Sequence, residues 1–164
     1  MSRRYTRVEN AFIDITNECN ASCPFCFLRR GSGVRRITMR KGDLDVLFET
    51  LENIGVVNIT LVGGEPLILP EDYLSFLLFE VIPCYKFKSV NVETNGSTLG
   101  RVRGRIIDAF TNVYVSVDYY DRRHELVRGI RVFDQLKFTP EGGIYVYGPY
   151  RGFVYWGMNT IIGF

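Results

Sequence analysis

The chain has 164 residues, a length typical of one globular domain with a substantial core. Hydrophobic residues make up 46% and charged residues 23%, which excludes an intrinsically disordered chain. The net charge of +2 does not indicate a nucleic-acid partner, and no apolar run is long enough to span a membrane. The amino terminus lacks the apolar segment of a signal peptide, so we expect a cytoplasmic protein with reduced thiols.

The first part of the chain alternates between strand-like and helix-like segments. Residues 11–16 are a short β-branched run that predicts a strand, and a loop rich in cysteine and arginine follows to about residue 38. Apolar residues recur at helical spacing over residues 39–54, which predicts an amphipathic helix. The run VVNITLV at residues 56–62 predicts a second strand, and the sequence GGEP follows it directly.

The same alternation continues to residue 118. Residues 70–83 predict a helix bounded by prolines, with two acidic residues in its first turn. Residues 89–93 predict a third strand followed by TNG, residues 98–110 a weaker helix with two glycines, and residues 112–118 a fourth strand. Alternation of this length predicts an α/β fold with parallel strands joined by right-handed crossovers.

The last segment has a different composition, because aromatic residues and glycines replace charged ones from residue 138 onward. The runs IYVY and FVYW predict a β-hairpin there, and the residues after Gly129 are too few for two further strand-crossover-strand units. We therefore expect a partial parallel (β/α) barrel of four, at most five, parallel strands. The aromatic hairpin, with Trp156, would cover the open edge or pair with another chain. A sheet that is open on one side would leave a site at its edge accessible to a bulky substrate, such as a protein or peptide.

Three of the four cysteines lie within eight residues, in the sequence CNASCPFC. Cys19, Cys23 and Cys26 have C-x3-C-x2-C spacing, and a short loop with this spacing can direct three thiolates at one metal centre. Three ligands leave one coordination position open, as catalysis requires, whereas a fourth would close a structural site. A zinc site completed by Cys84 or His124 is therefore an alternative.

Position in the predicted fold argues against Cys84 as the fourth ligand, and the local sequence argues against His124. Ligands of βα folds gather at the carboxyl ends of the strands, where the loop with the three cysteines begins. Cys84 follows a predicted helix and so belongs to the opposite edge, where we expect it to be a small buried residue. His124 lies on the correct side, but within the charged run DRRHE, which predicts a solvated loop histidine.

Glycine and polar residues follow the other three predicted strands as well. GGEP occupies residues 63–66, ETNG residues 93–96 and SVD residues 116–118. Turn formation alone would explain the glycines and the proline. Because all these motifs fall at the carboxyl ends of parallel strands, a single binding site explains them together.

CNASCPFC after one strand and GGEP after the next resemble the radical S-adenosylmethionine (SAM) superfamily. The resemblance covers about residues 10–129 of what we expect to be a single core domain over residues 1–164, and leaves residues 130–164 as an unmatched aromatic, glycine-rich tail. The passage SVDYYDRRHELVRG, residues 116–129, also resembles the SxD…H…RG passage of members that modify peptides or make cofactors.

The resemblance implies two cofactors, a four-iron four-sulfur cluster and SAM. Cys19, Cys23 and Cys26 would hold three of the irons, and the amino and carboxylate groups of SAM the fourth. Phe25 matches an aromatic position near the adenine. The other residues implied to bind SAM are Gly63, Gly64, Glu65 and Pro66 at the methionyl amine, Ser116 and Asp118 at the methionine or ribose, and Glu93 and Asn95.

The implied reaction is reductive cleavage of SAM to methionine and a 5′-deoxyadenosyl radical, which removes hydrogen from a substrate that the sequence does not name. The implied partners are an electron donor such as flavodoxin or ferredoxin, and a small-molecule, protein or peptide substrate. An activating protein for a glycyl-radical enzyme is one alternative. A non-catalytic truncated module with a structural metal site is the other.

Overall fold

The structure, a computed structural model, describes most of the chain in full and three later strands by their backbone alone. The fully described residues are 8–29, 35–102, 104–119 and 121–134, and the later strands are residues 136–138, 144–146 and 155–157. Among these residues, no helix combines the length and the apolar character needed to cross a membrane.

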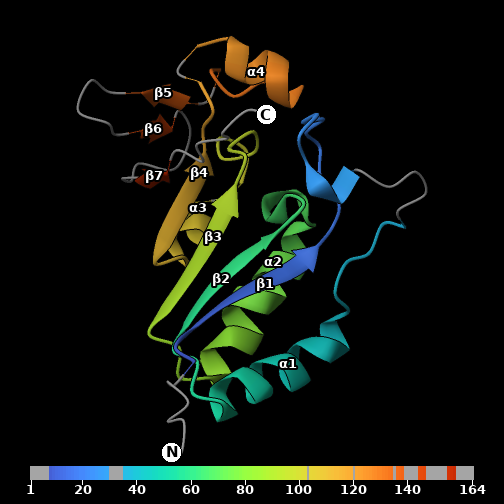
Figure 1. Cartoon of the computed structure of the whole chain (residues 1–164). Helices are drawn as coiled ribbons and strands as arrows, with labels where there is room; N and C mark the ends of the chain where they lie inside the picture. Colours follow the sequence, from blue (N-terminus) through green and yellow to red (C-terminus); the bar gives the residue numbers. More distant parts are fainter. Residues whose placement is uncertain are drawn as a thin grey trace, which may run out of the picture.

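Five strands form one parallel sheet in the order β1-β2-β3-β4-β7 (Figure 1). Their bounds are β1 Asn10–Thr16, β2 Asn58–Gly63, β3 Ser89–Thr94, β4 Asn112–Ser116 and β7 Tyr155–Gly157. The prediction of an α/β partial barrel with four to five parallel strands is confirmed. Since all five strands run in the same direction, their carboxyl ends meet at one edge of the sheet, at the top of Figure 1.

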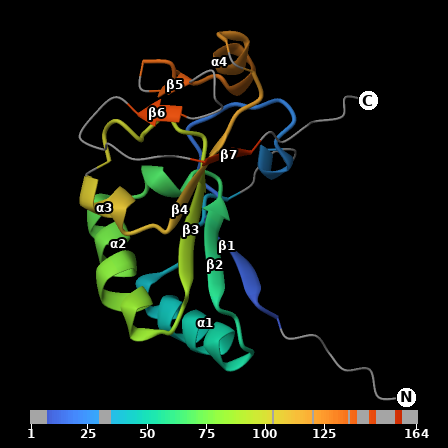
Figure 2. The same ribbon diagram turned by 90° about the vertical axis from the view of Figure 1, so that its left-hand side faces the viewer.

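Three helices cover one face of the sheet (Figure 2). They are α1 Lys41–Asn53, α2 Glu71–Ser75 and α3 Gly104–Asp108; α2 continues through a π-helical segment, Phe76–Val81, into a 3-10 turn, Ile82–Cys84. A fourth helix, α4 Arg123–Arg128, lies beyond the carboxyl ends of the strands (Figure 1). Two more 3-10 turns occupy Phe27–Arg29 and Pro66–Ile68.

The alternation of residues along the strands explains which face the helices cover. Ile13 and Ile15 of β1 are buried against the helical layer, together with Val113 and Val115 of β4. Phe12, which lies between the two isoleucines, points to the other face and is 69% exposed. The period of two along each strand therefore places the apolar core between sheet and helices and leaves the opposite face partly open.

The carboxyl-terminal hairpin differs from the sequence prediction in its pairing. β5 Leu136–Phe138 pairs antiparallel with β6 Ile144–Val146, whereas β7 leaves the hairpin and pairs in parallel with β4. The edge of β4 offers unpaired backbone groups, and a fifth parallel strand satisfies them. The predicted interface role of the tail aromatics, Trp156 included, concerns side chains that lie outside the described residues.

Candidate active site

A cavity of about 310 Å³ lies at the carboxyl ends of β1 to β4. The segment that follows β1, residues 17–26, carries the three clustered cysteines and is called the cysteine loop below. All three thiols are free and line this cavity. Seven of the nine residues predicted to bind SAM also line it, namely Phe25, Gly63, Gly64, Glu93, Asn95, Ser116 and Asp118.

The three thiols face the common cavity from different positions on its wall. Among the described residues, no three cysteine, histidine or acidic side chains converge closely enough to hold a single metal ion. Cys23 is buried, and Cys19 and Cys26 are partly exposed. Burial raises the pKa of Cys19, and it also raises the pKa of Cys23, where the nearby Arg128 guanidinium opposes it.

Two N–H groups, one from the loop backbone and one from the side chain that follows β3, lie near the Cys19 sulfur. Its sulfur accepts a hydrogen bond from the Ala21 N–H at 3.4 Å and a longer contact from Asn95 Nδ2 at 3.9 Å. Asn95 Nδ2 also donates to Asn20 Oδ1 at 2.9 Å. Asn95 therefore joins the end of β3 to the cysteine loop, as expected from the convergence of strand ends.

The two glycines after β2 pack directly against the backbone of the cysteine loop. Gly64 N–H donates to the Thr16 carbonyl at 2.7 Å, and Glu65 N–H donates to the Glu18 carbonyl at 2.8 Å. A Cβ at Gly63 would collide with the Thr16 carbonyl oxygen, and one at Gly64 with the Glu18 carbonyl oxygen. Gly63 also has φ of +129°, a conformation that favours glycine. These glycines are therefore required by close backbone approach.

Glu65 lies behind the cavity wall, where it is fully buried. Its carboxylate accepts hydrogen bonds from Thr94 Oγ1 at 2.7 Å, Asn95 N–H at 2.6 Å and Leu67 N–H at 3.1 Å. Burial raises the pKa of Glu65, and these three donors oppose the shift. Glu65 and the buried Pro66 are the two predicted SAM contacts that the cavity wall does not include, and Glu65 links the end of β2 to β3 instead.

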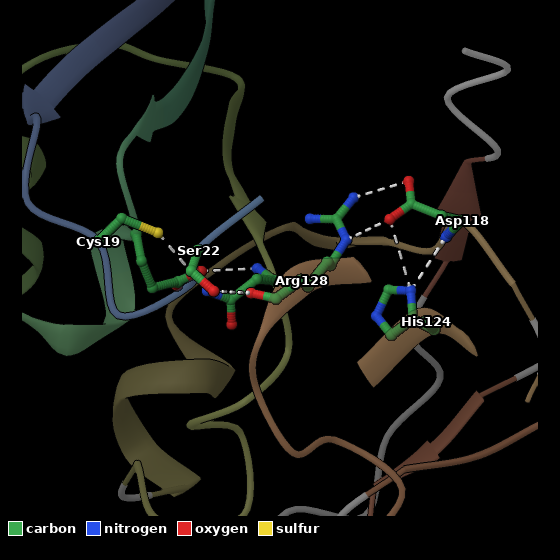
Figure 3. A network of polar contacts seen from close by, with 7 residues as sticks. Cys19, Ser22, Asp118, His124 and Arg128 are labelled. Atoms are coloured by element: carbon green, nitrogen blue, oxygen red, sulfur yellow. Dashed lines mark hydrogen bonds and ion pairs between the residues drawn. The ribbon is translucent and has the colours of Figure 1, made fainter. Parts of the chain in front are cut away.

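The end of β4 is joined to α4 by a buried ion pair (Figure 3). Arg128 donates to both carboxylate oxygens of Asp118, from Nε at 2.6 Å and from Nη2 at 3.0 Å. The guanidinium carbon also lies 5.9 Å from the centre of the Phe25 ring. Arg128 lines the cavity, and the signal for it in the sequence is the RG pair of the passage that resembles other members.

His124 is not the solvated loop histidine that its charged surroundings suggested. It lies in α4 with only 1% of its surface exposed, and its Nδ1 accepts a hydrogen bond from the Asp118 N–H at 3.1 Å. Burial, with the charge of Arg128, lowers the pKa of His124, which favours the neutral imidazole. Its Nδ1 is engaged with the residue that follows β4 by two positions, and His124 does not line the cavity with the three cysteines, which argues against a role as a fourth zinc ligand.

Cys84 is not buried, contrary to the expectation. It is exposed in the 3-10 turn that precedes β3, and its thiol donates to the Glu80 carbonyl at 3.2 Å. The apolar residues around it in the sequence face the core, whereas Cys84 falls on the outer side of the turn. Its place before β3, away from the strand carboxyl ends, agrees with the prediction and leaves Cys84 without access to the cavity.

Comparison with known proteins decides the family. Residues 13–138 match the profile of the radical SAM superfamily. The chain belongs to the radical SAM superfamily. The predicted family is therefore confirmed, and so are the two cofactors of that superfamily, SAM and a four-iron four-sulfur cluster.

Individual relatives cover most of this chain. It is 27% identical over 133 residues to a probable GTP 3′,8-cyclase of Pyrococcus horikoshii, which covers 79% of this chain and 41% of that protein. It is 29% identical over 119 residues to the sporulation killing factor maturation protein SkfB of Bacillus subtilis. That match covers 71% of this chain and 28% of SkfB. The chain therefore spans less than half the length of these curated relatives.

The fold is shared with solved structures of radical SAM proteins. Streptococcus suis SuiB, in a crystal structure with its precursor peptide SuiA bound, superposes with a TM-score of 0.59 at 21% sequence identity. The superposition covers 76% of this chain and 28% of SuiB. At this identity the similarity shows the common architecture.

The donor set of the cavity fits the two cofactors. Three free thiols line one cavity and would suffice to hold three irons of a cluster while leaving the fourth open, and neither Cys84 nor His124 lines the same cavity. The cavity continues from the thiols to polar groups at the ends of β3 and β4, Glu93 and Ser116 among them. A small polar molecule that coordinates the open iron would lie against those groups.

Proposed function

We propose that this chain holds a four-iron four-sulfur cluster through Cys19, Cys23 and Cys26 and cleaves SAM reductively. The observation that carries the proposal is that three free thiols and seven residues predicted to bind SAM line one cavity. When bound, the reduced cluster would supply one electron for the cleavage of SAM into methionine and a 5′-deoxyadenosyl radical, which would take a hydrogen atom from the substrate.

The residues of the chain orient the cofactors and keep water from them. The three thiolates would hold three irons of the cluster, and Glu93, Asn95 and Ser116 line the same cavity, where they would be available to SAM. These polar side chains are suited to the amino, carboxylate and ribose groups of SAM. Phe25 supplies an aromatic surface for the adenine, while Gly63 and Gly64 bring the end of β2 against the cysteine loop.

The proposed substrate is a peptide or a small molecule. SkfB is named as a maturation protein for a killing factor, and SuiB was crystallised with its precursor peptide, which favours a peptide. The probable GTP 3′,8-cyclases favour a small molecule. We further propose a reducing compartment, the cytoplasm, because the cluster requires free thiols, and a flavodoxin or ferredoxin as electron donor.

Anaerobic reconstitution with iron and sulfide tests this function. We expect a brown protein that binds four irons and, with SAM and a reductant, forms 5′-deoxyadenosine. Alanine at Cys19, Cys23 or Cys26 should abolish the cluster, whereas Cys84→Ala is the matched control and should retain it, because Cys84 is exposed and distant from the cavity.

The same experiment separates the alternatives. A cluster that forms without any 5′-deoxyadenosine would favour a non-catalytic module. Binding of zinc in place of iron would refute the cluster itself. An activating protein for a glycyl-radical enzyme would cleave SAM and transfer the radical only to a protein partner, so product formation with peptides would exclude that alternative.

A further inference from the structure

Asp118 was expected to contact SAM, but its carboxylate is already engaged. Both of its oxygens accept hydrogen bonds from Arg128, at 2.6 Å and 3.0 Å, and its Oδ2 lies 3.6 Å from His124 Nδ1. Only 7% of the Asp118 side chain and 9% of the Arg128 side chain are exposed. In Figure 3 the guanidinium of Arg128 lies between the Asp118 carboxylate and Cys19.

Arg128 is in turn bonded to the cysteine loop through its main chain. Its carbonyl accepts a hydrogen bond from the Ser22 N–H at 2.6 Å and from Ser22 Oγ at 3.4 Å (Figure 3). Ser22 immediately precedes Cys23, one of the three cluster ligands in the proposed function. The next residue, Gly129, packs so tightly on Ser22 that a Cβ there would collide with its hydroxyl.

These contacts form a continuous chain from the end of β4 to the cysteine loop. Asp118 fixes the guanidinium of Arg128 with two charge-assisted hydrogen bonds, and this bidentate geometry leaves the arginine little freedom. With its side chain fixed, the last turn of α4 holds the Arg128 carbonyl where the Ser22 N–H can donate to it. Asp118, Arg128 and Ser22 thus connect the end of β4, α4 and the loop that bears Cys23.

We propose that Asp118 is a positioning residue that acts through Arg128 to hold Ser22 and the adjacent Cys23 in place, and that it is not a direct ligand of SAM. The inference rests on the proposed function for the role of Cys23 as a cluster ligand. The series of contacts from Asp118 through Arg128 to Ser22 is present in the protein without any cofactor. The two statements can therefore be tested separately.

Amide hydrogen exchange of the metal-free protein tests the positioning. Asp118→Asn and Arg128→Gln should each raise the exchange rate of the Ser22 amide about tenfold or more, because the carbonyl that accepts its hydrogen is no longer held. Asp121→Asn is the matched control, since Asp121 pairs with Arg123 at the exposed start of the same helix and should leave Ser22 unchanged. Unchanged Ser22 exchange in both variants would overturn the proposal.

A milder variant keeps the test decisive if the first two do not fold. Arg128→Lys retains the positive charge and loses the bidentate geometry, so we expect an intermediate increase in Ser22 exchange. Protection equal to that of the wild type in this variant would likewise count against the proposal.

A double-mutant cycle on the reconstituted protein then separates positioning from direct contact. SAM is titrated against the oxidised cluster in Asp118→Asn, Arg128→Gln and the double variant. If Asp118 acts through Arg128, the double variant should bind SAM no more weakly than the Arg128→Gln variant. A further loss of about tenfold on adding Asp118→Asn would show a direct contact and refute the proposal. If the wild type forms no cluster, the proposed function fails while hydrogen exchange still decides the positioning.

Discussion

The cysteine loop is held on two sides by contacts of different kinds. On the β2 side, the backbone N–H groups of Gly64 and Glu65 donate to carbonyls at the start of the loop, and neither Gly63 nor Gly64 has space for a Cβ. On the α4 side, the loop meets the Arg128 carbonyl and Gly129, whose positions depend on a buried ion pair with Asp118. Each side also has one buried carboxylate that the sequence suggested for SAM.

The difference lies in how each carboxylate is satisfied. Glu65 is surrounded by neutral donors, two backbone N–H groups and a hydroxyl, and joins neighbouring strands. Asp118 faces a guanidinium and joins a strand to a helix. Backbone contacts make the β2 side intolerant of change, whereas the α4 side depends on side chains whose loss can be compensated by a second substitution.

The largest effect is expected on the β2 side. Gly64→Ala places a Cβ against the Glu18 carbonyl, and no side chain can move to relieve a collision with backbone. We expect the free energy of unfolding to fall by about 3 kcal/mol or more, as measured by denaturant titration. A loss below about 1 kcal/mol would show that the two backbones separate easily there.

The two carboxylates should respond differently to the loss of charge. Asp118→Asn leaves a buried guanidinium without its counter-charge, for which we expect a loss of about 3 kcal/mol in the free energy of unfolding. Glu65→Gln should cost only about 1–2 kcal/mol, because burial already disfavours its ionised form and only one hydrogen bond is turned into a clash of donors. Equal losses in paired denaturant titrations would contradict the distinction between the two sides.

The α4 side also offers a compensation that the β2 side lacks. Gly129→Ala should cost about 1–2 kcal/mol, because Gly129 has φ of +65° and its Cβ would strike the Ser22 side chain. Adding Ser22→Gly removes the obstacle and should restore part of the loss, leaving the cost of the left-handed conformation. No recovery in the double variant would place the strain elsewhere.

The smallest effect is a pH dependence on the α4 side. His124 has a pKa below its usual value because it is buried near Arg128, although Asp118 and Glu125 oppose the shift. The unfolded chain therefore binds more protons below the usual histidine pKa of about 6.5, so the free energy of unfolding should fall as the pH is lowered through that value. His124→Asn, which retains an acceptor for the Asp118 N–H, should flatten this slope between neutral pH and pH of about 5. An unchanged slope would assign the dependence to another group.

The strands and the cavity could be predicted from sequence because their signals are local. β-branched runs, glycine pairs and cysteine spacing are all visible within a few residues, and parallel strands bring their ends together. The partners of Glu65 and Asp118 were not predictable in the same way. Whether a carboxylate at a strand end faces a ligand or a neighbouring donor depends on burial, which the pattern of one chain does not reveal.

Two errors have the same origin. The arginines and acidic residues beside His124 predict a solvated side chain, but α4 turns these neighbours toward solvent and the imidazole toward the end of β4. The apolar neighbours of Cys84 predict a buried thiol, whereas the 3-10 turn directs Cys84 outward. The predicted pairing of the hairpin is wrong for a different reason. β7 pairs with β4, which lies almost forty residues earlier, and no local signal in the sequence distinguishes β4 from β6 as its partner.

The hydrogen bond between Ser22 and Arg128 joins residues 106 positions apart in the chain. A contact of this span forms only after the intervening strands and helices have assembled, because closing so long a loop carries an entropic cost that earlier contacts must offset. The thiols therefore reach their final arrangement late in folding. A chain emerging from the ribosome would present its cysteines long before α4 exists to arrange them.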